Sequence, residues 1–151
     1  MTGTVKEGGA RVAVTGASGF IGRHVVKSLL KRGADVTVAT RNPAQLQDIE
    51  RAVKAVMFDM SAIGKDIYDQ LGRPEILVHL AWNGLPNYKS LHHFETELPR
   101  QYGFLKQMIE AGLPALLVIG SSFEFVGHDG LFNRNASFHG PDAACGRQSG
   151  R

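Results

Sequence analysis

The chain is poor in cysteine and has no long hydrophobic run. Its 151 residues include one cysteine, Cys145, which excludes a disulfide framework within the chain. No apolar stretch approaches the ~20 residues that span a membrane, and Met1–Ala10 lacks a hydrophobic signal region. We therefore expect no membrane partner and a location in the reducing cytoplasm.

Two further absences narrow the classes of function. The sequence has no Gly-Lys-Ser or Gly-Lys-Thr loop, which argues against an NTPase. The net charge is only +3, and basic residues gather only at Lys27, Lys31 and Arg32 and at Arg147 and Arg151. Such small groups are typical of solvated faces, with a basic partner surface as the alternative. We expect no metal site and no nucleic-acid partner.

The most informative stretch is rich in glycine. Residues 11–22 read Arg-Val-Ala-Val-Thr-Gly-Ala-Ser-Gly-Phe-Ile-Gly, so a β-branched run enters a turn that contains Gly16, Gly19 and Gly22. An apolar-periodic helix follows through about Lys31. Where a strand turns on glycine into a helix, the backbone can approach a pyrophosphate and the free helix N–H groups face it. The stretch therefore predicts a phosphate-binding turn in an α/β fold.

Strand and helix patterns alternate along the chain. The expected strands are 12–15, 35–40, 54–58, 76–80 and 115–119, and the expected helices are 20–31, 43–53, 63–71 and 91–111, the last mostly helical and interrupted or kinked at Pro99. This rhythm predicts a doubly wound, Rossmann-like parallel sheet of about five strands in the order 3-2-1-4-5. The apolar runs at 76–80 and 116–119 predict strands covered on both faces.

Composition divides the chain into three parts. Residues 1–10 are expected to be a flexible tail, and residues 11–127 a Rossmann-like domain that carries the phosphate-binding turn. Residues 128–151 have few aliphatic side chains and no clear period, so we expect an irregular or disordered tail. The tail has two open explanations, a truncation with a diverged end or a shifted reading frame after about Gly127. Either would leave the C-terminal part of the fold incomplete.

The glycine turn resembles a known fingerprint. Thr15 through Gly22 is similar to the Thr-Gly-x-x-Gly-x-x-Gly motif of extended short-chain dehydrogenases/reductases, the NAD(P)-dependent epimerases and dehydratases of nucleotide sugars. The alternative is a tight glycine turn without a ligand. The resemblance implies that the cofactor is bound by Gly16, Ser18, Gly19, Phe20, Ile21 and Gly22.

Two strand ends bear on the choice of cofactor. Dinucleotide sites that prefer NAD carry an acid at the end of the second strand. Here Arg41 stands at that place, and its guanidinium suits a 2′-phosphate, so NADP is favoured over NAD. The alternative is that Arg41 only covers the sheet edge.

In the resembled family an acid such as Asp59 accepts a hydrogen bond from adenine and Met60 flanks the ring. The alternative for Asp59 is a helix N-cap.

The segment after the fourth strand resembles the family's His-Leu-Ala-Ala. The resemblance implies that Leu80, Ala81 and Trp82 pass beneath the cofactor, while His79 is predicted to be a packed strand residue. Gln101 falls where many members carry a structural Asn of the active site. The 91–111 helix resembles the one that pairs subunits in this family, which implies a possible homodimer.

The catalytic residues are only partly present. The resemblance implies that Ser121 or Ser122 polarises the reacting oxygen of a nucleotide-sugar substrate. The family's Tyr-x-x-x-Lys should follow about two dozen residues later, but Cys145 and Ser149 stand in those positions. The chain is therefore interpreted as the coenzyme-binding part of an epimerase/dehydratase-type oxidoreductase, catalytically impaired. The alternative is a non-catalytic dinucleotide-binding or partner-binding module.

Overall fold

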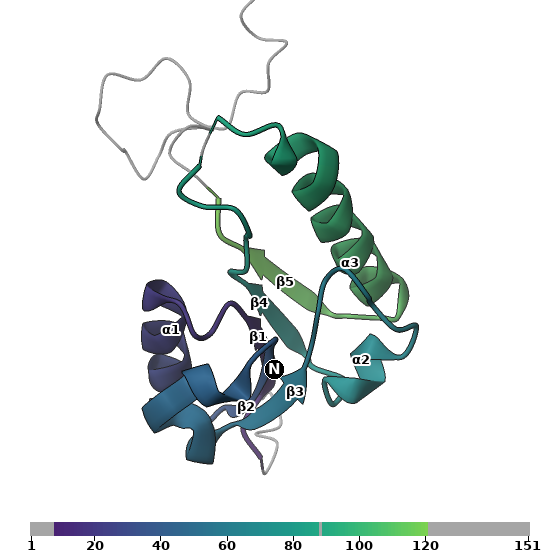
Figure 1. The fold of residues 1–151 in the computed structure, drawn as a ribbon. Helices are drawn as coiled ribbons and strands as arrows, with labels where there is room; N and C mark the ends of the chain where they lie inside the picture. The colour runs from purple at the N-terminus through teal and green to yellow at the C-terminus, as the bar shows by residue number, and fades with distance from the viewer. Residues whose placement is uncertain (1–7, 88, 121–151) are drawn as a thin grey trace, which may run out of the picture. The chain divides into compact units, whose positions relative to one another are not determined.

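The computed structural model describes residues 8–87 and 89–120. They form a five-stranded parallel sheet in the order β3-β2-β1-β4-β5 (Figure 1). The strands are β1 (Arg11–Thr15), β2 (Asp35–Thr40), β3 (Lys54–Met57), β4 (Ile76–His79) and β5 (Ala115–Val118). By its contacts the chain divides into Met1–Ile119 and Gly120–Arg151, and the first unit holds all of these strands. The predicted fold class and strand order are confirmed.

The helices depart from the sequence prediction in three places. They are α1 (Phe20–Lys31), the 3-10 helix η1 (Pro43–Ala52), α2 (Ile67–Gln70), the π-helical turn η2 (His93–Glu97) and α3 (Leu98–Glu110). The helix predicted at 43–53 is 3-10, and the helix predicted at 63–71 is one short turn. Glycine destabilises a helix interior by about 1 kcal/mol, and Gly64 lies in the part that stays non-helical.

Pro99 lies where the long helix changes type. It stands in the first turn of α3, directly after the π-helical turn η2. The helix predicted at 91–111 is therefore present over most of its length, and η2 interrupts its regular part just before Pro99. A π-helical turn depends on tertiary contacts, and no local sequence pattern marks it.

The core lies on both faces of the sheet. Alternate β1 residues serve opposite faces, so Val12 and Val14 pack with α1 and η1, whereas Ala13 packs with α2 and α3. Val26 of α1 and Phe104 of α3 are the fully buried centres of these two layers. The sheet is thereby held between helices, and the carboxyl ends of its strands point to one common edge.

Strand β5 is more open than its sequence predicts. All four of its residues are exposed, although the apolar run had predicted a strand covered on both faces. It pairs with β4 alone in the described part of the chain and forms the edge of the sheet there. The prediction fails because an apolar run reports a buried strand only where other elements pack on it.

Candidate functional site

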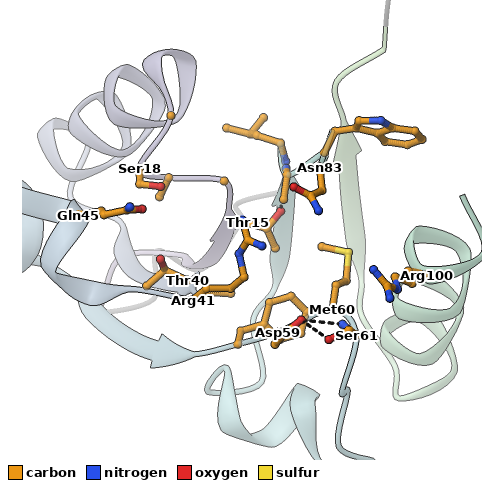
Figure 2. A pocket seen from close by; sticks show the side chains of 18 of the residues that line it. Thr15, Ser18, Thr40, Arg41, Gln45, Asp59, Met60, Ser61, Asn83 and Arg100 are labelled. Atoms are coloured by element: carbon orange, nitrogen blue, oxygen red, sulfur yellow. Dashed lines mark hydrogen bonds between the residues drawn. The ribbon is translucent and has the colours of Figure 1, made fainter. Parts of the chain in front are cut away.

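A pocket of about 420 Å³ lies where the carboxyl ends of β1 to β4 meet (Figure 2). This edge of a doubly wound sheet, beside the strand at which the order reverses, is where such folds bind ligands. Nine of the predicted cofactor residues line the pocket: Gly16, Ser18, Gly19, Arg41, Asp59, Met60, Leu80, Ala81 and Trp82. The pocket therefore unites four segments that lie far apart in the sequence.

The three glycines of the turn differ in what an added side chain would meet. Gly16 has φ +72°, and a Cβ there would lie 2.8 Å from the Ala81 nitrogen. At Gly22 a Cβ would lie 2.1 Å from the Gly16 oxygen, so α1 packs against the turn only without a side chain. Gly19 has an ordinary φ of −72°, and a Cβ there would meet only the Gly16 oxygen, at 3.3 Å. Glycine at position 19 is thus required neither by φ nor by an outright clash, although an added Cβ would be tight against that oxygen.

The N-terminus of α1 is prepared for an anion. Gly19 is the N-cap residue and supplies no side-chain hydrogen bond, and the first turn carries no acid. The first N–H groups of a helix have no intrahelical acceptor, so this end presents donors and the positive end of the helix dipole. Arg23 fixes the turn, because it donates to the Ser18 oxygen at 3.1 Å and to the Gln45 oxygen at 3.1 Å.

Three predicted residues of the turn do not line the pocket with side chains. Phe20 is 84% exposed and Ile21 is 52% exposed, and neither is among the residues that line the cavity. Gly22 is buried against the turn. A ligand in the pocket could therefore meet these residues only through backbone N–H groups.

Asp59 forms the opposite wall of the pocket. Its Oδ1 accepts hydrogen bonds from the Ser61 nitrogen at 2.8 Å and from the Ser61 hydroxyl at 2.7 Å (Figure 2). These bonds, followed by the charges of Arg41 and Arg100, hold the pKa of Asp59 below its ordinary value. Since α2 begins only at Ile67, Asp59 is not a helix N-cap.

Arg41 points into the pocket between Thr40 and Asp59 (Figure 2). It makes no hydrogen bond or ion pair with another described residue, which leaves its guanidinium free to meet a ligand. Arg100 of α3 lies on the other side of Asp59 and also lines the pocket. The adenosine end proposed from the sequence is therefore flanked by two arginines rather than one.

His79 lies beneath the pocket as a packed strand residue, as predicted. The Thr15 hydroxyl donates to its Nδ1 at 2.8 Å, and its Nε2 hydrogen-bonds the Gln101 Oε1. Thr15 also accepts from the backbone nitrogens of Leu80 at 3.2 Å and Ala81 at 3.3 Å. Burial lowers the pKa of His79 against the opposing effects of Gln101 and Glu97, so the imidazole is neutral at pH 7.

Sequence reasoning missed several pocket residues. Glu97 and Arg100 come from η2 and α3, and the others that were missed are Thr15, Ala17, Ala39, Thr40, Gln45, Phe58, Ser61 and Asn83. No apolar period marks Glu97 in the sequence. It shares one buried helical face with Gln101, Phe104 and Met108, but two of these four side chains are polar, so the buried face shows only in the structure.

The remaining predicted site residues cannot be placed. Ser121, Ser122, Cys145 and Ser149 lie outside the described residues. Within residues 8–87 and 89–120, no group of three or more His, Cys, Asp or Glu side chains could hold a metal ion. The same part of the chain has no helix long and apolar enough to cross a membrane.

Comparison with known proteins agrees with this architecture. Residues 12–137 match the NAD dependent epimerase/dehydratase family. The chain is 31% identical to a dTDP-6-deoxy-L-talose 4-dehydrogenase (NAD(+)) of Aggregatibacter actinomycetemcomitans over 120 residues, or 77% of this chain and 44% of that relative. It therefore spans less than half of that relative's length.

Solved structures show the same fold. MoeE5 in complex with UDP-glucose and NAD aligns with a TM-score of 0.66 and 24% identity over 86% of this chain and 42% of that chain. Gre2 of Candida albicans in complex with NADPH aligns with a TM-score of 0.60 and 23% identity over 74% of this chain and 37% of that chain. The glycine turn, the strand order and the match over residues 12–137 lead to one conclusion, that this chain belongs to the NAD-dependent epimerase/dehydratase family.

Proposed function

We propose that this chain binds a nicotinamide dinucleotide in the pocket at the carboxyl ends of β1 to β4. The observation that carries the proposal is the end of α1. Its N-terminus has no capping side chain and no acid, and Gly19 stands there with an ordinary φ, where an added Cβ would meet one atom, the Gly16 oxygen, at 3.3 Å. A pyrophosphate that approaches the backbone at this point accounts for both features.

The adenosine half would lie between the turn and Asp59. The Oδ2 of Asp59 makes no hydrogen bond with other described residues, so it can accept from the adenine amino group while Met60 flanks the ring. Arg41, on the same side, can pair with a 2′-phosphate, which favours NADP over NAD. Proteins of the same fold bind either cofactor, since MoeE5 was solved with NAD and Gre2 with NADPH.

The nicotinamide half would lie along Leu80, Ala81 and Trp82. A bound nicotinamide supplies hydride chemistry, and the names of the relatives point to nucleotide sugars as the substrate class. In such a chain Ser121 or Ser122 would donate a hydrogen bond to the reacting oxygen. We propose that these 151 residues alone do not turn over substrate, because no Tyr or Lys follows Lys106 to handle the proton.

Trp82 offers a direct test, because it is the single tryptophan of the chain and lines the pocket. Titration with NADP and with NAD is expected to change Trp82 fluorescence saturably, with NADP the tighter ligand. An assay of nicotinamide absorbance with UDP- and dTDP-sugars is expected to show no turnover. Absence of saturable binding below about 1 mM, or about −4 kcal/mol, would contradict the binding proposal. Robust turnover would contradict the proposed catalytic impairment.

A second role, pairing with another copy of the chain, is favoured by an apolar stripe on the outer face of η2 and α3 and the turn before them. The stripe consists of the exposed side chains Leu91, Phe94, Leu98, Tyr102 and Ile109. They recur at intervals of three, four or seven residues, and so share one helical face. Exposed apolar residues gathered in this way mark interaction surfaces.

Substitution in this stripe tests the pairing. Leu98→Asp is expected to convert dimers to monomers in sedimentation velocity, because it places a charge at the centre of the apolar stripe. Lys31→Asp, an exposed charge change on α1 at the other face of the sheet, is the control and should leave the sedimentation coefficient unchanged. A wild-type chain that stays monomeric at high micromolar concentration would refute the pairing.

A further inference from the structure

Glu97 is a buried carboxyl group that faces a binding pocket. It is the last residue of the π-helical turn η2, it is only 3% exposed, and it lines the pocket. Acids are seldom buried unless they are hydrogen-bonded, because burial removes them from water. The bonds of Glu97 therefore show what its burial accomplishes.

Glu97 holds the segment that follows β4 at two points. Its Oε1 accepts from the backbone nitrogen of Asn83 at 3.1 Å and from Nε2 of Gln101 at 2.6 Å. The same Gln101 nitrogen donates to the Ala81 oxygen at 3.0 Å. Residues 81 and 83 are thus tied, one directly and one through Gln101, to a single carboxyl oxygen. Asn83 lies on the pocket side of this segment (Figure 2).

Trp82, between the two tied residues, is held from the same turn. Its indole Nε1 donates to His93 Nδ1 at 3.0 Å, and the other nitrogen of His93 hydrogen-bonds the Asn87 oxygen at 2.8 Å. His93 is the first residue of η2 and Glu97 the last. The first residue of the π-helical turn therefore bonds Trp82, and its last residue bonds Asn83. Single π-helical turns of this kind are often found at functional sites.

We propose that Glu97 is a positioning residue for dinucleotide binding, and that it acts by fixing residues 81–83 as the pocket wall. The inference rests on the proposed function. The proposal assigns no contact between Glu97 and the ligand, because Oε1 accepts from Asn83 and Gln101 and Oε2 lies 3.8 Å from Nε2 of His92. A wall that shifts by even about 1 Å weakens binding, because the ligand groups no longer meet their partners.

Two substitutions separate this role from plain packing. Glu97→Gln keeps an oxygen that can accept from Asn83 and Gln101, whereas Glu97→Leu keeps the volume and removes the acceptor. Trp82 is 42% exposed, so water can reach the released wall and the fold need not fail with it. Glu95→Gln, an exposed acid in the same turn, is the control.

Three measurements are made on each variant of the full chain: the Kd for NADP, the emission maximum of Trp82 and the Tm. Glu97→Leu is expected to raise the Kd at least about tenfold and to shift the emission to longer wavelength, with the Tm within a few degrees of wild type. Glu97→Gln should restore the Kd to within about threefold of the wild-type value, and Glu95→Gln should change nothing.

The outcomes are separable. A wild-type Kd for Glu97→Leu overturns the inference, and so does an equal loss in Glu97→Gln, which would show a need for charge rather than for an acceptor. If Glu97→Leu does not fold, Gln101→Met carries the test, since it cuts the tie to Ala81 and must weaken binding and shift the emission. Failure of the wild type to bind any dinucleotide refutes the proposed function instead, and the Trp82 emission of the variants still decides whether Glu97 holds the wall.

Discussion

Gly22→Ala is expected to destabilise the fold severely, by more than about 3 kcal/mol. The added Cβ would lie 2.1 Å from the Gly16 oxygen and 2.7 Å from the Ala17 Cα, and both atoms belong to the backbone. Neither can move aside as a flexible side chain would, so α1 itself must shift away from the turn. Urea unfolding followed through Trp82 fluorescence measures the loss.

Gly19→Ala is the matched substitution three residues earlier. It is expected to change stability little and to weaken dinucleotide binding strongly. The φ of −72° suits alanine, and the nearest atom to the new Cβ, the Gly16 oxygen, lies 3.3 Å away. We expect a loss of stability of no more than about 1 kcal/mol, mainly because alanine is a poorer N-cap than glycine. The Kd for dinucleotide should rise at least about tenfold, since the methyl group takes the place of the pyrophosphate.

The pair of variants distinguishes architecture from ligand binding. If Gly22→Ala proves as stable as wild type, the close approach of α1 to the turn is not as described. If Gly19→Ala folds and binds dinucleotide as tightly as wild type, the proposed pyrophosphate position is wrong. The same chemical change is thus expected to remove stability at one glycine and affinity at the other.

Arg41→Ala is expected to reverse the preference between the two dinucleotides. A charge-assisted pair with a 2′-phosphate contributes about 1.5–3 kcal/mol, so the Kd for NADP should rise about 10- to 100-fold. The Kd for NAD, which lacks this phosphate, should change less than about twofold. Because Arg41 is exposed, the difference between the ligands should also shrink as salt is added.

Arg100→Ala provides the matched control for charge. Arg41 and Arg100 both line the pocket and both act on Asp59, so each substitution removes one positive charge from the same site. We expect Arg100→Ala to affect NADP and NAD to a similar extent. Calorimetric titration of both ligands against both variants measures the four changes in Kd. Equal effects of Arg41→Ala on NADP and NAD would refute its assignment to the 2′-phosphate.

The sheet and the glycine turn could be predicted because their signals are local. The Val-Ala-Val-Thr run, the glycines and the helix period all lie within residues 11–31, and each local preference agrees with the final fold. Asp59 and Arg41 could be placed for the same reason, since each stands at the end of a strand whose direction the pattern fixes. In a parallel sheet, these ends must meet.

The Glu97 wall could not be predicted in this way. A glutamate reads as an exposed residue in any local pattern, and its partners Asn83 and Ala81 lie on another segment. The π-helical turn that carries Glu97 is likewise stabilised by contacts rather than by propensity. The hydrogen bonds that could not be predicted from the sequence therefore join segments that are far apart in the chain, and only the folded backbone brings them within hydrogen-bond distance.

The exposure of β5 has a consequence for how the chain behaves at high concentration. Natural sheets use lysine, other charged residues and proline to keep an edge strand from pairing. The four residues of β5, Ala-Leu-Leu-Val, include none of these. In the described part of the chain nothing pairs with the far side of this strand. The backbone there offers N–H and C=O groups that a strand from elsewhere can join. The edge of the described sheet at β5 is thus a place where a strand of another copy could pair, which makes it a site of self-templated aggregation at high concentration.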